Sequence, residues 1–306
     1  PLSLAMMRAL HEGLGIPAEV LLQDPGRELP ESRYDPRDFP FAEMHRRGYF
    51  APFDGSLSQA RARAEALLVD FFSVLGDRQP EPVLCRRMER KADVHALIAW
   101  QARVLQAASR EDLPTYDPAA IDDDSLQSLV QQSYFTTGPL NARELLNRWG
   151  VHLIIEPHLP HTYLDGAAFL SPHGRPVVGL TLRHDRLDNF WFTLLHEVAH
   201  VRLHLERDGV AFFDDTEHLG ADAGSPQERE ANDFAREVLI PNRSWEKVEP
   251  LLGRAPSERL VEEVADQLRL SPAIVAGRVR WQTQDYRQLG SLVGYRTVRE
   301  QFTRYG

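Results

Sequence analysis

The sequence predicts an α+β fold, in which a small mixed sheet carries two long helices and is flanked by helical regions at both ends. Residues 151–159 are typical of a strand, and residues 166–170 and 176–182, separated by SPHGR, are typical of a hairpin. Two helical patterns follow, at 188–206 and 225–241. The order helix, strand, hairpin, helix, helix indicates a compact unit with helices packed on a small sheet.

The part of the chain before this unit is predicted to be mainly helical. Residues 2–22 suggest a short helix, a glycine turn and a second helix that begins at Pro17. A stretch rich in Pro, Asp, Glu and Arg follows and marks a linker. From Phe41 to about Ser109 apolar residues recur at helical spacing, which predicts three or four helices. Arginines and aromatic residues alternate there, as in some nucleic-acid surfaces, but Asp and Glu are equally frequent, so a solvated helical bundle with a supporting or docking role is preferred.

Further helices are predicted before and after the segment that contains the sheet and the two long helices. A breaker ends near Ser125, and residues 126–134 suggest a helix. The segment GPLNARELLNRWG predicts another, with Pro139 near its start and Gly150 at its end. The tail from Pro256 is helical again. The expected organisation is residues 1–25, 26–124 (linker and helical region), 125–245 (the unit with the sheet) and 246–306 (helical tail).

Composition narrows the class of protein. The 306 residues include 35 basic and 45 acidic side chains, so 35 − 45 gives a formal net charge of −10. This balance argues against a chain that coats nucleic acid over its whole surface. The one cysteine, Cys85, excludes an intramolecular disulfide and a cysteine-built zinc site, and is typical of a reducing, cytoplasmic location. No apolar run approaches the ~20 residues of a membrane span, so no membrane association is expected.

The strongest chemical signal is His196-Glu197-Val198-Ala199-His200, an HExxH pattern. Four residues rise about 6 Å, just over one turn, so both imidazoles project from one helix face. Two imidazoles at this spacing can bind one Zn²⁺, together with a third protein ligand and water. Glu197, about 100° round the helix, can take a proton from that water. The alternative is a helix with incidental His and Glu, but this helix is apolar and expected to be buried, where such groups are costly unless paired or metal-bound.

The third ligand must come from outside this motif. The extended HExxHxxGxxH pattern is excluded, because Leu203 occupies its Gly position and Glu206 its last His position. His204 continues the four-residue series, but it lies about 12 Å from His196 along the helix axis and cannot share a metal with both histidines. A surface or packing role is therefore expected for His204.

Two glutamates of the second helix, Glu228 and Glu230, are candidates for that ligand. Glu228 lies on a face of small and apolar residues suited to close helix packing, whereas Glu230 points about 200° away, toward a solvated face. Asn232, one turn after Glu228, is placed to hydrogen-bond a metal-ligating histidine. The sequence SPQE also fits a capping box, in which Glu228 would fold back on the helix start and miss the metal. Glu228 is the preferred ligand, because an HExxH site needs a third one.

HEVAH, followed later by EREANDFAREVLIP, resembles the ImmA/IrrE family of zinc metallopeptidases. The upstream segments LDGAAFL and PVVGLTLRHDRLDNFWFTLL are similar to the strand, hairpin and helix that lead to that family's active site. The resemblance covers roughly residues 125–245 and implies a gluzincin-like minimal peptidase fold. It also implies His196, His200 and Glu228 as zinc ligands and Glu197 as general base.

The ends of the chain resemble longer members of the same family. The tail with SPAIVAGRVRWQTQ is similar to their C-terminal helices. Residues 2–22 are similar only to the last part of their N-terminal XRE-type helix-turn-helix domain, so residues 1–25 are expected to be the end of such a domain. Contact with DNA is then expected only through a more complete N-terminal domain.

The resemblance implies a function as well. Members of the family cut a repressor, usually of the helix-turn-helix class, and so switch on stress-response or mobile-element genes. We therefore expect a zinc-dependent, site-specific endopeptidase whose partner is such a repressor. The alternatives are a DNA-binding regulator or antitoxin-like protein that uses the peptidase fold as sensor or scaffold, and a pure interaction module. Glu197 argues against the regulator, since a structural zinc site needs no base, and so does the charge of residues 1–25, where one arginine and three acidic residues give 1 − 3 = −2.

Residues around the motif suggest little about how a substrate is held. The strand at 165–169 could pair with an extended peptide by strand addition, or it could be an ordinary edge strand. Tyr163, His184 and His218 flank the motif in predicted loops or strand ends. Each is expected to be an ordinary surface residue rather than a donor to the oxyanion.

Overall fold

The computed structural model describes residues 34–76, 92–205, 212–214 and 225–305. Three expectations from the sequence lie outside these residues: the helix-turn-helix remnant at 1–25, and the surroundings of Cys85 and His218. None of the described helices combines the length and the apolar character that a bilayer crossing requires.

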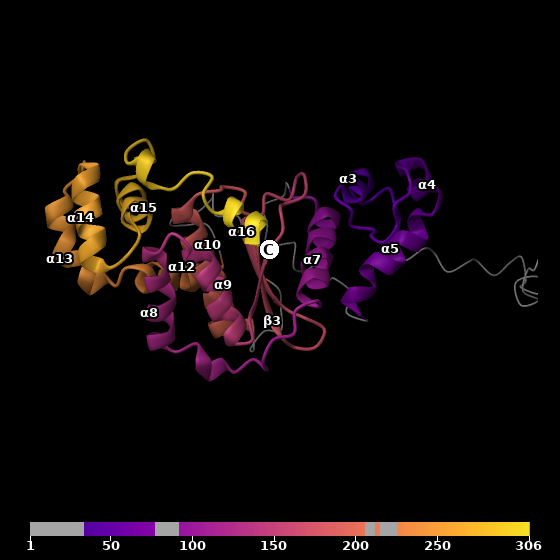
Figure 1. Ribbon diagram of the computed structural model, residues 1–306, viewed down its shortest axis with the longest axis horizontal. Helices are drawn as coiled ribbons and strands as arrows, with labels where there is room; N and C mark the ends of the chain where they lie inside the picture. Colours follow the sequence, from indigo (N-terminus) through magenta and orange to yellow (C-terminus); the bar gives the residue numbers. More distant parts are fainter. Residues whose placement is uncertain (1–33, 77–91, 206–211, 215–224, 306) are drawn as a thin grey trace, which may run out of the picture.

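A four-stranded mixed sheet lies at the centre of the structure (Figure 1). Its strands are β1 (His152–Ile155), β2 (Gly166–Leu170), β3 (Pro176–Leu180) and β4 (Phe212–Asp214), in the spatial order β1-β3-β2-β4. The hairpin of β2 and β3 is confirmed, and β1 pairs with β3 in parallel. The predicted α+β fold with a small mixed sheet is therefore correct. The sequence analysis missed β4, whose three residues are too few to show an alternating pattern.

Each face of the sheet is buried against a different set of helices. Ala168 and Val178 point into one hydrophobic core, while their chain neighbours Ala167 and Val177 point into the other. This alternation follows from the two-residue period of a strand, which sends successive side chains to opposite faces. The sheet is thus the middle of three layers.

The first outer layer is the N-terminal helical region. Its helices are α3 (Phe41–Arg46), α4 (Leu57–Ala62), α5 (Ala64–Phe72) and α7 (Val94–Ala108). The helix α7 lies against the sheet, with Trp100 donating a hydrogen bond from Nε1 to the carbonyl oxygen of Glu156 at 2.8 Å. A Cβ atom on Gly179 would lie 2.6 Å from the Trp100 ring, so this glycine lets the indole reach the strand. The helix α7 thus joins this helical region to one face of the sheet, and the supporting or docking role predicted for the region stays a prediction.

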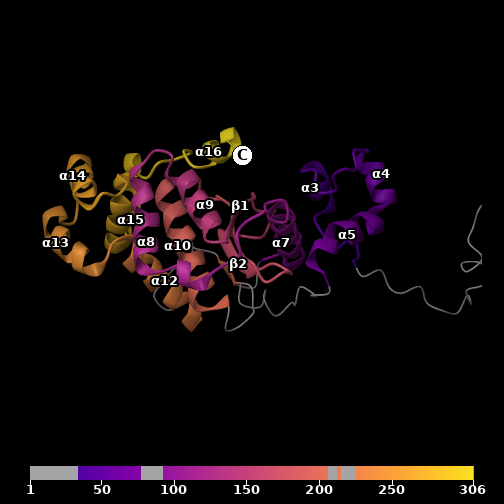
Figure 2. The same ribbon diagram turned by 60° about the horizontal axis from the view of Figure 1, so that its bottom comes forward.

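The second outer layer contains the two helices with the candidate site. It is made of α8 (Asp123–Gln131), α9 (Gly138–Arg148), α10 (Leu187–Leu203) and α12 (Pro226–Leu239). The helices α13 (Asn242–Leu252), α14 (Glu258–Leu268), α15 (Pro272–Thr283) and α16 (Arg299–Tyr305) complete the C-terminal part. Short 3₁₀ turns lie at Ser73–Leu75, Pro118–Ala120, Gln132–Tyr134 and Gly290–Leu292. Figure 2 shows α10 and α12 side by side, with α15 next to α10.

The helix α13 lies mostly within the predicted helical tail, but it was not predicted as a separate helix, although its sequence carries a signal. Trp245, Val248 and Leu252 are buried and follow helical spacing. Pro241, at the end of the helical pattern predicted over 225–241, lies at the N-cap of α13. A proline can end one helix and begin the next, because its fixed φ suits a helix start.

Candidate metal centre

The helix α10 brings the HExxH residues into the interior. It is buried on most sides, with Trp191, Leu194 and Leu195 fully covered. His196, Glu197 and His200 are also buried, at 1%, 0% and 0% exposure. Polar groups in such a place are unfavourable unless they are bound to partners. The expectation that this helix is buried is confirmed.

Three side chains that the sequence predicted as ligands converge there. The Nε2 atoms of His196 and His200 lie 3.0 Å apart. Glu228 Oε2 lies 3.3 Å from Nε2 of His196 and 3.7 Å from Nε2 of His200. These three residues form a group that could hold a metal ion. Glu228 keeps 22% of its side chain exposed, so the group is not sealed on its side.

The preference for Glu228 over Glu230 follows from how α12 packs. Ala231, Asn232 and Ala235 are buried along α10, and their small size allows the two helices to approach closely. Glu228 shares this face. The capping alternative is realised only by the backbone, since the N–H of Glu228 donates to Ser225 Oγ at 3.3 Å. The carboxylate remains available to the histidines, so the cap and the cluster coexist.

Asn232 holds the first histidine as the sequence predicted. Its Oδ1 lies 3.1 Å from Nδ1 of His196. With Nε2 of His196 turned toward the cluster, Nδ1 carries the proton and donates it to the amide oxygen. Such partners fix the tautomer and the ring orientation of a metal-ligating histidine.

His204 has a role that the sequence analysis missed. It is 4% exposed, and its Nδ1 lies 2.9 Å from Nδ1 of His200. Its Nε2 lies 3.2 Å from Oε2 of Glu230. When His200 Nε2 faces the cluster, His200 Nδ1–H donates to His204, and His204 Nε2–H donates to Glu230. The surface alternative expected for His204 is therefore wrong, and its packing is against a candidate metal ligand. The helical spacing was a usable signal, because a residue four positions after a ligand can contact that ligand.

Glu197 lies against the sheet, at the point where strand β2 begins. A Cβ atom on Gly166 would lie 2.4 Å from Glu197 Oε1 and 2.9 Å from Thr193 Cγ2. Any residue other than glycine would therefore displace the carboxylate or the strand. Gly166 was not identified from the sequence, because the close approach exists only once β2 packs on α10.

The donor set fits a metal ion such as zinc. Two imidazole nitrogens and one carboxylate oxygen are the ligands of many catalytic zinc sites. Ligands about 2.0–2.1 Å from a tetrahedral zinc lie roughly 3.3 Å from one another. The three observed separations of 3.0, 3.3 and 3.7 Å surround this value. The described residues supply three ligands and thus leave a position for water.

Two expectations about the surroundings of the motif change. The strand at 165–169 is not an edge strand, because β2 pairs with β3 on one side and, over Gly166 to Ala168, with β4 on the other. Strand addition to that stretch is therefore blocked. Tyr163 is 40% exposed, in agreement with a surface residue. His184 lines a pocket beside α10.

A comparison with known families agrees with this site. Residues 147–280 match the family model described as the IrrE N-terminal-like domain, Peptidase_M78. The match begins in the last turn of α9 and ends within α15, so it includes the sheet and the metal cluster. No curated protein matches the chain. The predicted resemblance to the ImmA/IrrE family is confirmed for this part, while the helix-turn-helix remnant and the region boundaries stay predictions.

Proposed function

Because residues 147–280 are an IrrE N-terminal-like domain of a peptidase family, we propose that the chain is a zinc-dependent, site-specific endopeptidase. The observation that carries the proposal is the convergence of His196, His200 and Glu228 beside the buried carboxylate of Glu197. The ligands would hold zinc through Nε2 of each histidine and through Oε2 of the glutamate. Zinc supplies Lewis acidity when bound: it lowers the pKa of water toward ~7 and polarises a carbonyl.

The residues of the chain then carry out the proton transfers. Glu197 accepts a proton from the attacking water and passes it to the amine that leaves when the peptide bond breaks. Burial between α10 and β2 keeps the carboxylate in one place, which such transfers require. Asn232 and His204 hold the two imidazoles in the tautomers that turn Nε2 to the metal.

The substrate follows from the family resemblance. We infer that it is a protein, and specifically a transcriptional repressor of the helix-turn-helix class whose removal switches on a stress or mobile-element response. The acidic balance of the chain, −10, supports the role of an enzyme that cuts a DNA-binding protein over that of the DNA-binding protein itself.

The proposal is tested with the zinc-loaded protein and the repressor encoded beside its gene. We expect one defined cut, found by mass spectrometry of the fragments. Glu197→Gln should lower the rate by about 10²–10⁴-fold, the usual contribution of a general base, while one zinc ion per chain remains bound. Glu262→Gln, at an exposed position of α14, is the matched control and should cut normally.

Two results would contradict the proposal. Cutting by Glu197→Gln at the rate of the unchanged protein would remove Glu197 from the mechanism. Zinc content that stays the same in His196→Ala would remove the metal centre.

A further inference from the structure

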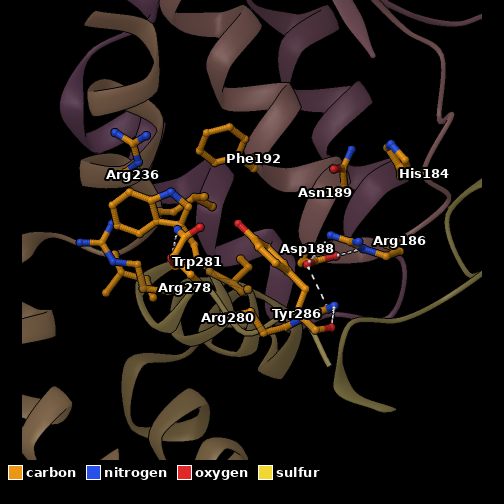
Figure 3. Close-up of a pocket in the computed structure, with 15 residues that line it drawn as sticks. His184, Arg186, Asp188, Asn189, Phe192, Arg236, Arg278, Arg280, Trp281 and Tyr286 are labelled. Atoms are coloured by element: carbon orange, nitrogen blue, oxygen red, sulfur yellow. Dashed lines mark hydrogen bonds and ion pairs between the residues drawn. The ribbon is translucent and has the colours of Figure 1, made fainter. Parts of the chain in front are cut away.

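A pocket of about 460 Å³ lies next to the metal cluster (Figure 3). It is lined by the start of α10, the end of α12 and much of α15. Phe192, one turn before His196, lines the pocket, and its ring centroid is 6.3 Å from that of His196. Arg236, which also lines it, lies eight residues after Glu228 on α12, about 12 Å along the helix axis. The pocket therefore lies beside His196, toward the start of α10 and the end of α12.

Two arginines give the pocket a positive charge. The guanidinium carbons of Arg236 and Arg278 lie 4.5 and 5.2 Å from the centroid of the Trp281 ring. Figure 3 shows all three at one end of the pocket. Both arginines are partly buried. Among the residues that the structure describes, Arg236 forms an ion pair only with Asp233, whose side chain is 78% exposed. The side chains of Arg236 and Arg278 therefore place two positive charges close together in a partly buried position.

Arg278 has unused hydrogen-bonding capacity. Its Nη2 donates to Asn242 Oδ1 at 3.2 Å, and it forms no ion pair with a carboxylate in the described part of the chain. Its Nε and Nη1 are buried and have no hydrogen-bond partner among those residues. Burial and the charge of Arg236 lower the pKa of Arg278. A guanidinium in this state favours an anion that can accept hydrogen bonds from both nitrogens.

The acid of the lining, Asp188, faces the other two arginines. Arg186 Nε donates to Asp188 Oδ1 at 2.8 Å, and Arg280 Nη1 lies 3.9 Å from Asp188 Oδ2. Arg280 Nη2 also donates to the carbonyl oxygen of Tyr286 at 2.5 Å, while its Nε and Nη1 have no hydrogen-bond partner among the described residues. Asp188 therefore does not neutralise Arg278. The floor next to the arginines is apolar and includes Leu239 and Ile240. A fitting ligand thus has an acidic group on a partly apolar body.

We propose that this pocket binds an aspartate or glutamate side chain of the peptide substrate and so selects where the chain is cut. The inference rests on the proposed peptidase function. A peptide is favoured over a free small anion because Phe192 of the lining lies next to His196 of the metal cluster, so one extended ligand can reach from the pocket to the cluster. The volume lies within the range of about 300–1,000 Å³ of ligand sites and exceeds what one small ion needs.

The first test measures cleavage preference. The zinc-loaded protein is given a library of peptides from a digested proteome, and the cut sites are identified by mass spectrometry. We expect Asp or Glu at one fixed position near the cut, favoured about tenfold to hundredfold, the usual range for a hydrogen bond to a charged group. Arg236→Gln and Arg278→Gln should remove this preference. Arg278→Glu should favour Lys or Arg at that position, which a general loss of folding would not produce.

The matched control is Arg61→Gln, an exposed arginine on α4 outside the pocket. It makes the same change in net charge and should leave the preference intact. A cleavage profile without acidic preference, or one that Arg278→Gln leaves unchanged, would overturn the inference.

The second test does not depend on cleavage. Fluorescein-labelled, blocked peptides with Glu or Gln between alanines are titrated against the Glu197→Gln protein by anisotropy. We expect the Glu peptide to bind at least about tenfold more tightly, and this difference to vanish in the Arg278→Gln background. If the first test shows no cutting at all but this difference is present, the peptidase function fails and the acidic-peptide pocket stands.

A competition experiment distinguishes an acidic side chain of a peptide from a free small anion as the ligand of the pocket. Inorganic phosphate and glutarate are titrated as competitors of the labelled Glu peptide. Weak competition, only at millimolar concentration, supports a peptide ligand. Tight binding of either anion without any preference for the Glu peptide would overturn the inference and identify the pocket as a site for a free anion.

Discussion

Gly166 lacks a side chain at the point where strand β2 meets the carboxylate of Glu197. Its neighbours on the strand, Ala167 and Ala168, are buried in opposite cores, but Gly166 faces Glu197, the general base of the proposed mechanism. His204 is a similar case, since only its buried contact with His200 gives it a role. In both places a residue outside the HExxH motif positions a residue of the motif: Gly166 positions Glu197, and His204 positions His200.

Replacing Gly166 should therefore impair catalysis while sparing the metal. Gly166→Ala adds a Cβ that would lie 2.4 Å from Glu197 Oε1, so the carboxylate must move. A displacement of about 1 Å in a catalytic group can cost ~10²-fold in rate. We expect a loss of this size in cleavage of the repressor, with zinc content unchanged.

The control for this change is Gly290→Ala, where an added Cβ meets no atom within 4 Å. It should cut at the normal rate. Full activity of Gly166→Ala would show that Glu197 does not need its observed position.

Among the elements, the segment that follows α7 is tied to the sheet through one partly buried carboxylate. Glu111 accepts a hydrogen bond from Arg143 of α9 at 2.6 Å, and its other oxygen lies 3.0 Å from Nδ1 of His152 in β1. Burial would raise the pKa of Glu111, but the hydrogen bonds from His152 and Arg143 outweigh it and lower this pKa. The carboxylate thus joins three segments that are distant in the sequence.

This pKa shift predicts a dependence of stability on pH. A carboxyl group with a lowered pKa in the folded state stabilises the protein above its unfolded value, about 4.3, and loses that effect as the pH falls through the folded value. Glu111→Gln should lower the free energy of unfolding by about 1–3 kcal/mol at pH 7. The difference in free energy of unfolding between this variant and the unchanged protein should become smaller as the pH falls from about 5 to about 3.

Urea unfolding at a series of pH values checks this prediction. Glu144→Gln on α9, with a side chain 71% exposed, is the control and should change stability by less than about 0.5 kcal/mol. If the difference in free energy of unfolding between Glu111→Gln and the unchanged protein stays constant down to pH 3, the Glu111 carboxylate does not stabilise the fold through its contacts with Arg143 and His152.

For the complete chain, the metal cluster joins α10 to α12, and these two helices carry much of one outer layer. A ligand that binds only the folded state raises its stability, by about 2.7 kcal/mol at a concentration of 100 Kd. For a chain of this size such a gain corresponds to a rise in Tm of about 4 °C. The metal should therefore contribute to stability as well as to catalysis.

Chelation measures this contribution. We expect 1,10-phenanthroline to lower Tm by several degrees and added zinc to restore it. His204→Ala should need about 10–100-fold more zinc for the same effect, since it removes the partner of His200. His173→Ala, at an exposed turn, should behave as the unchanged protein. An equal Tm with and without zinc would exclude metal binding to the folded state.

The sequence was enough to predict the parts of the site whose geometry is local. A helix has about 3.6 residues per turn, so sequence positions alone tell which side chains share a helix face. This rule places His196 beside His200 on one helix, and Glu228 beside Asn232 on the other. The hairpin and the fold class follow from apolar periodicity in the same way.

The tertiary structure decided what depends on contacts between distant segments. Only the packing of α12 on α10 placed Glu228 among the histidines and linked Glu230 to His204. Only the packing of α15 on α10 brought Arg278 next to Arg236 and formed the cationic pocket. These contacts join side chains that are far apart in the sequence, and the periodicity of a helix or strand relates only residues that are close in the sequence. The sequence therefore predicted the three residues that could hold a metal, and the fold added the residues that position them and the pocket beside them.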